Sequence, residues 1–125
     1  MKKLPKISES EWLVMQVLWK KSPLTANEIV KELAGNTKWK PKTIKTLITR
    51  LTKKGAVKFE KEGRLYKYHP SVSKNECVRM ERRSFVRRVY GGINKPMLVS
   101  FLEDADLSVE DISELKRILD QKVEE

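Results

Sequence analysis

The stretch from Pro41 to Gly55 constrains the fold of this 125-residue chain more than any other. Its aliphatic residues recur at intervals of three and four, which predicts a helix with one buried face. Proline suits the first turn of a helix and glycine the position just past its end, so both boundaries are marked. The opposite side carries basic and hydroxyl side chains and no acid. The buried face consists of Ile44, Leu47, Ile48 and Leu51.

The outward side of this predicted helix has the chemistry of a DNA contact. An α-helix fits the major groove, where lysine and arginine can bind phosphate or guanine and threonine can pack its methyl group on thymine. A solvated helix face is the alternative, but threonine is a mediocre helix former and four occur here. The predicted contact residues are Lys42, Thr43, Lys45, Thr46, Thr49, Arg50 and Lys53.

Two capping boxes precede this helix, at residues 8–11 and 25–28. In each, a hydroxyl residue is followed three positions later by glutamate, which predicts the start of a helix. The second helix should end at Gly35 and Asn36, residue types that adopt the left-handed conformation at helix C-termini. The sequence therefore predicts two short helices ahead of the amphipathic one.

A β-hairpin is predicted after the amphipathic helix. Residues 57–61 and 65–68 alternate between apolar and polar side chains around Gly63, as strands joined by a tight turn do. Three helices followed by a hairpin is the order of a winged helix-turn-helix. We expect Arg64, beside Gly63, to reach the DNA backbone or minor groove from the hairpin tip. A basic edge kept against aggregation is the alternative explanation of the hairpin charges.

The remaining sequence is predicted to be helical, over residues 73–90, 96–102 and 108–123. The predicted fold class is thus mostly α with a small β-hairpin. We expect a winged-helix DNA-binding domain at 1–72 and a helical dimerisation domain at 73–125. The apolar residues of the last two helices form the predicted dimer interface, or else an intrachain core. They are Leu98, Phe101, Leu102, Ile112, Leu115, Ile118 and Leu119.

Charge is unevenly distributed along the chain. The formal net charge is +10, but residues 1–75 hold 18 basic and 6 acidic residues, whereas residues 76–125 hold 9 and 11. Positive charge concentrated in one half indicates a polyanionic ligand. The amino-terminal Lys2, Lys3 and Lys6 could add phosphate contacts. The arginines at 79–88 fit either phosphate or the acids of the last helix.

The sequence argues against an enzyme, a metal site or a cofactor. The single histidine, His69, has no second histidine or cysteine beside it, and no phosphate-cradling glycine loop is present. The single cysteine, Cys77, is interpreted as a packed thiol and suits a reducing cytoplasm. No apolar run approaches the length of a membrane span. We therefore expect a cytoplasmic protein whose partner is a nucleic acid.

The motifs together resemble the BlaI/MecI family of bacterial penicillinase and methicillin-resistance repressors. Residues 39–55 are similar to its recognition-helix signature, with support from residues 7–12, 61–64 and 94–107. The resemblance implies a homodimer, joined through its C-terminal helices, on a palindromic operator in double-stranded DNA. It also implies that the principal groove-facing residues are Lys42, Thr43, Thr46 and Arg50.

The resemblance further implies inactivation by proteolysis in the dimerisation region. In the family a membrane-bound β-lactam sensor triggers this cleavage, and the matching bond here is Ser100–Phe101. The family has asparagine where this chain has Ser100, which is a departure. A regulator of the same architecture that serves another promoter or signal is the main alternative. A nonspecific architectural DNA-binding protein is the other, whereas the paired aromatics of an RNA-stacking sheet are missing.

Overall fold

The computed structural model describes residues 4–92 and 95–124. The chain forms two compact units that divide between Glu81 and Arg82. No helix of the described residues is long and apolar enough to cross a membrane. The predicted fold class, mostly α-helical with a small β-sheet, is confirmed.

Three helices form most of the first unit: α1 (Glu9–Lys20), α2 (Ala26–Ala34) and α3 (Pro41–Lys54). Both predicted capping boxes are present, because Ser8 and Thr25 each accept a hydrogen bond from the backbone N–H of a glutamate three residues later. Gly55 ends α3 with a φ of 84°, as predicted. The left-handed end predicted for α2 is wrong, since Gly35 has a φ of −77° and is right-handed.

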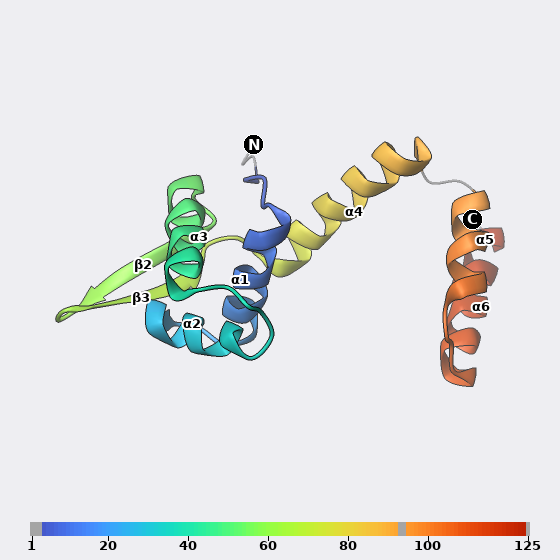
Figure 1. Ribbon diagram of the computed structural model, residues 1–125. Helices are drawn as coiled ribbons and strands as arrows, with labels where there is room; N and C mark the ends of the chain where they lie inside the picture. The colour runs from blue at the N-terminus through green and yellow to red at the C-terminus, as the bar shows by residue number, and fades with distance from the viewer. Residues whose placement is uncertain (1–3, 93–94, 125) are drawn as a thin grey trace. The chain divides into compact units, whose positions relative to one another are not determined.

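The sheet has one strand more than predicted. The hairpin strands β2 (Val57–Glu62) and β3 (Leu65–Pro70) pair antiparallel, and the two-residue strand β1 (Leu24–Thr25) pairs with the other edge of β3. Gly63 has a φ of 66° at the first of two turn residues, where a type II′ turn requires a positive value. The hairpin extends away from the three helices (Figure 1).

The core of the first unit lies between the three helices and the base of the sheet. Val57 and Leu24 pack there against the aliphatic faces of α1, α2 and α3. Cys77, in the first half of α4 (Lys74–Tyr90), is fully buried in the same core. This burial confirms the interpretation of Cys77 as a packed thiol, and it raises the pKa of the thiol.

The connection from the sheet to α4 is also fixed to the first unit. The indole N–H of Trp19 donates to the carbonyl oxygen of Val72 at 3.0 Å, and the Ser71 hydroxyl donates to the carbonyl oxygen of Gly55. These bonds and the burial of Cys77 explain why the compact units divide within α4. The functional boundary predicted between residues 72 and 73 therefore falls inside the first compact unit.

The second unit contains the end of α4, α5 (Lys95–Asp104) and α6 (Val109–Glu124). The end of α4 and α5 meet through aromatic rings. The Phe101 ring centroid lies 5.8 Å from that of Tyr90 and 6.5 Å from that of Phe85. Among the residues that the structure describes in this unit, Val86 and Met97 are the buried hydrophobic ones. Such a small core leaves most apolar side chains of α5 and α6 exposed.

Candidate nucleic-acid interface

Helix α3 presents its polar side to solvent as a continuous surface. Its four aliphatic residues are buried against the core, which fixes the rotation of the helix. In the described part of the chain, none of the basic residues on the outer face forms an ion pair, so their charges are uncompensated. All seven side chains of α3 that are predicted to contact DNA are exposed: Lys42, Thr43, Lys45, Thr46, Thr49, Arg50 and Lys53.

Two threonines of this face, Thr46 and Thr49, have a defined hydroxyl orientation. Thr46 donates to the carbonyl oxygen of Lys42 at 2.9 Å, and Thr49 donates to that of Lys45 at 3.0 Å. Because each hydroxyl proton is used within the helix, the outward groups are a methyl and an oxygen acceptor. Such a surface complements a thymine methyl or the amino groups of adenine and cytosine in the major groove.

Lys54 does not belong to this outer face, although it follows Lys53 in the sequence. Its ammonium binds Oε1 of Glu11 and also donates to the carbonyl oxygen of Lys6 at 2.9 Å. Glu11 is buried, with 1% of its surface exposed. The contact joins the end of α3 to the beginning of α1. Sequence reasoning assigned Glu11 only its capping role, because its second partner is distant in sequence.

The hairpin carries Arg64 at its turn, exposed and directly after Gly63. Sequence reasoning treated the hairpin as a uniformly basic wing, but its lysines differ. Lys67 pairs with Glu62 at 3.0 Å, whereas the Lys61 ammonium lies over the Tyr66 ring at 6.0 Å from its centroid. The exposed rings of Phe59 and Tyr66 were not singled out. Their alternation with lysine in residues 57–68 is the signal that could have found them.

The remaining basic residues that were predicted to make contacts fall into two groups, the amino-terminal lysines and the arginines of α4. Lys2 and Lys3 lie outside the described residues, and Lys6 is exposed. The arginines at 79–88 form no ion pair with the acids of α6 among the described residues, so that predicted pairing is not found within one chain.

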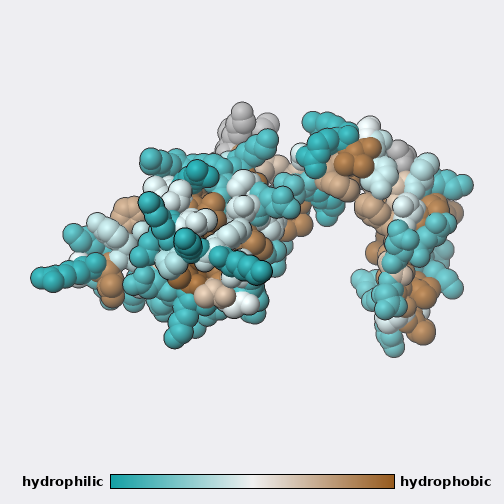
Figure 2. Space-filling view, viewed as in Figure 1, coloured by the Kyte–Doolittle hydropathy of each residue, from teal (hydrophilic) through white to brown (hydrophobic). Residues whose placement is uncertain are grey.

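The predicted interface residues of the second unit are mostly exposed. Leu115 is partly buried, whereas the others remain accessible in the single chain, and hydrophobic atoms are visible on this part of the surface (Figure 2). Ser100 and Phe101 lie within α5, and the Phe101 side chain is 46% exposed despite its aromatic contacts. The exposed members are Leu98, Phe101, Leu102, Ile112, Ile118 and Leu119.

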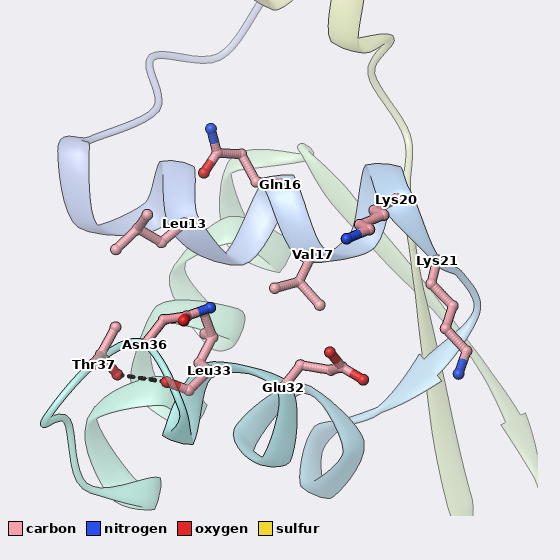
Figure 3. Close-up of a pocket in the computed structure, with 9 residues that line it drawn as sticks. All are labelled: Leu13, Gln16, Val17, Lys20, Lys21, Glu32, Leu33, Asn36 and Thr37. Atoms are coloured by element: carbon pink, nitrogen blue, oxygen red, sulfur yellow. Dashed lines mark hydrogen bonds between the residues drawn. The ribbon is translucent and has the colours of Figure 1, made fainter.

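A pocket of about 550 Å³ lies between α1 and α2 (Figure 3). Leu13, Val17 and Leu33 provide its apolar wall, and Lys20 and Glu32 lie at its rim. No cluster of three or more potential metal ligands occurs in the residues that the structure describes. His69 lies near the base of β3, paired with Lys58.

The model of the penicillinase repressor family matches residues 7–121. This chain belongs to the penicillinase repressor family. The penicillinase repressor of Bacillus licheniformis is 44% identical over 97% of this chain and 94% of its own length. The methicillin resistance regulatory protein MecI of Staphylococcus aureus is 38% identical over 93% of this chain and 94% of its own length. Family membership makes the chain a repressor rather than an enzyme.

Solved structures of this repressor family match the first unit. The DNA-binding domain of the repressor BlaI is 47% identical, with a TM-score of 0.54, over 61% of this chain and 93% of that one. The monomeric form of Bacillus licheniformis BlaI, solved in complex with the blaP half-operator, matches with the same coverage, 47% identity and a TM-score of 0.53. The winged-helix architecture predicted from the order of elements is thereby confirmed.

Proposed function

We propose that this chain is a transcriptional repressor that binds a palindromic operator as a homodimer and controls β-lactam resistance genes. The acid-free, exposed outer face of α3 carries the proposal. The similarity of the first unit to a BlaI structure bound to a half-operator supports the same assignment. The uncompensated lysines give affinity for phosphate, and the side chains that reach base edges give specificity.

The proposed roles along α3 follow from side-chain chemistry. Arg50 has a planar fork that can bind guanine or phosphate with two hydrogen bonds. Thr46 and Thr49 read thymine methyl or base amino groups, because their hydroxyl protons are occupied. Lys42 and Lys53 lie near opposite ends of the helix, where each can bind a phosphate or a guanine acceptor, and Lys42 is one of the proposed groove-facing residues. Arg64 adds a contact from the hairpin tip.

The homodimer is proposed to form through the second unit. Its exposed apolar side chains on α5 and α6 form a surface that would be costly to leave in water. Two linked DNA-binding units reach half-sites about one helical turn or a multiple apart, and the first contact raises the effective concentration of the second. Separation of the dimer would leave each monomer with only weak half-site affinity.

Induction is proposed to occur by cleavage of the Ser100–Phe101 bond, in the cytoplasm, after a membrane-bound β-lactam sensor is activated. The bond lies within α5, the helix that carries Leu98, Phe101 and Leu102 of the proposed interface. Cleavage there would remove α6 and its apolar residues from the dimer. Ser100 instead of the family asparagine favours one alternative, a repressor of the same architecture that answers a different protease or signal.

The experiment that tests the proposal is selection of bound duplexes from a randomised DNA pool at near-physiological salt. We expect a palindrome with half-sites spaced by about one helical turn or a multiple. A search for that palindrome upstream of β-lactamase or sensor genes then tests the regulated function. Recovery of no consensus sequence would indicate a nonspecific architectural DNA-binding protein and would contradict the repressor assignment.

A further inference from the structure

The two faces of the hairpin differ in chemistry because paired residues of antiparallel strands share a face. The register pairs Phe59 with Tyr68 and Lys61 with Tyr66, so these four side chains lie on one face. The same face holds Val57, which is buried in the core against α3. We call it the aromatic face. The opposite face holds Lys58, Glu60, Glu62 and Lys67.

Charge is balanced on the opposite face and unbalanced on the aromatic face. Lys67 pairs with Glu62 at 3.0 Å, and Glu60 faces Lys67 across the strands. The aromatic face has one cation, Lys61, and no acid. Its ammonium lies 6.0 Å from the Tyr66 ring centroid, a contact that orients the side chain and leaves its charge available to an anion.

The rings of the aromatic face are exposed where the hairpin extends past the helices. Phe59 is 47% exposed and Tyr66 is 45% exposed, and their ring centroids lie 4.9 Å apart in an edge-to-face arrangement. Hydrophobic atoms lie beside the hydrophilic tip of the hairpin (Figure 2). A half-exposed aromatic pair beside a cation that has no acidic partner is typical of a surface that meets a ligand.

We propose that the hairpin meets DNA with its aromatic face, so that Lys61 binds a backbone phosphate and the rings of Phe59 and Tyr66 pack on deoxyribose. This inference rests on the proposed function. The helices, α3 included, lie on the same side of the sheet as this face, because Val57 and Leu24 point into their shared core. One duplex can therefore contact both α3 and the aromatic face. The opposite face remains in solvent.

The test compares Lys61→Ala with Lys67→Ala in the full-length chain. Both changes remove one lysine from the same hairpin, but from opposite faces. Affinity is measured as a function of salt for the selected duplex and for a random-sequence duplex, because a phosphate contact is independent of sequence. We expect Lys61→Ala to weaken binding about three- to tenfold on both duplexes. The slope of log affinity against log salt concentration should also decrease in magnitude by about one. Lys67→Ala should change affinity less than about twofold.

Two further variants test the geometry. Lys61→Arg keeps the cation and should restore most of the affinity, whereas Tyr66→Ser removes a ring and should weaken binding with unchanged salt slope. Equal effects of Lys61→Ala and Lys67→Ala would overturn the aromatic-face proposal. Failure of the proposed function looks different, because then the wild-type chain selects no palindrome and Arg50→Ala has no specific effect. Thermal unfolding of each variant checks that the fold is intact.

Discussion

Lys54 and Glu11 join the end of α3 to the beginning of α1. The Lys54 ammonium binds Oε1 of Glu11, and that oxygen also accepts the backbone N–H of Ser8 at 2.8 Å. Glu11 is almost completely buried, whereas Lys54 is about one-third exposed. One carboxylate therefore caps α1 and holds α3. This relationship divides the two neighbouring lysines of α3 into a structural one, Lys54, and a surface one, Lys53.

Lys54→Met should lower the free energy of unfolding by about 2–3 kcal/mol, because it leaves the buried Glu11 carboxylate without its cation. Lys53→Met is the matched control: it should change stability by less than about 0.5 kcal/mol but weaken DNA binding. Urea denaturation and duplex titration of both variants check this. Equal stabilities of the two variants would show that the ion pair contributes nothing to folding.

The same pair gives the stability a defined pH dependence. Burial raises the pKa of Glu11, but the hydrogen bonds from Lys54 and Ser8 outweigh burial and hold that pKa below its usual value. A carboxylate whose pKa is lower in the folded state stabilises the fold above its unfolded pKa. That contribution is lost as the pH falls below about 4.3 and through the lower folded value.

In Lys54→Met the lowering of the Glu11 pKa should disappear, since its strongest favourable partner is gone and burial remains. The acid-induced loss of stability should then begin at higher pH than in the wild type. Denaturant midpoints measured between about pH 3 and pH 7 test this. Glu28, whose pKa is lowered by its capping bonds to Thr25, is common to both proteins and cancels in the comparison. Identical pH profiles would assign the wild-type dependence to other carboxylates.

Most of the first unit could be predicted from the sequence because its signals are local. Capping boxes and the spacing of aliphatic residues gave all three helices, and the exposed face of α3 follows from the same periodicity. The strand β1 could not be predicted, because a segment of two residues shows no periodicity. Leu24 belongs to a strand only because it pairs with Tyr68. The conformation of Gly35 could not be predicted either, since glycine permits the left-handed conformation without requiring it.

The role of a site residue could be predicted where its residue type alone determines its chemistry. It was missed where contacts with residues distant in sequence determine that role. Arg64 was placed by its turn, but the different roles of Lys61 and Lys67 depend on which strand face each occupies and on the position of Glu62. The second partner of Glu11 is 43 residues away in sequence, beyond any local pattern. The contact and interface residues themselves stay predictions about DNA and a second chain.

Thr46→Ala should weaken binding to the selected duplex about tenfold and to a random-sequence duplex less than about twofold, because base contacts specify whereas phosphate contacts do not. The matched control is Thr52→Ala, which removes a similar hydroxyl that donates to the carbonyl oxygen of Ile48 at 2.8 Å, on a half-buried side of α3. Fluorescence anisotropy with both duplexes gives the two affinities. Equal losses on both duplexes would remove Thr46 from base recognition.

Phe101→Asp should shift the protein from dimer to monomer, because dimerisation would bury a carboxylate among apolar side chains. A cost of about 3 kcal/mol corresponds to a more than hundredfold weaker dimer. Sedimentation over a range of protein concentrations measures the change. Val109→Asp is the control: Val109 is apolar and exposed at the start of α6, lies outside the proposed interface, and an acid is favourable there.

Phe101 also contacts Phe85 and Tyr90 within its own chain, so Phe101→Asp alone could act by loosening α5. Leu119→Asp removes that ambiguity, because Leu119 is 57% exposed in the single chain and its substitution leaves the aromatic contacts in place. If both variants sediment as monomers while Val109→Asp remains dimeric, the apolar surface of α5 and α6 is the interface. A dimer that survives Leu119→Asp and Phe101→Asp would place the contact elsewhere, and cleavage at Ser100–Phe101 would then lose its proposed route to derepression.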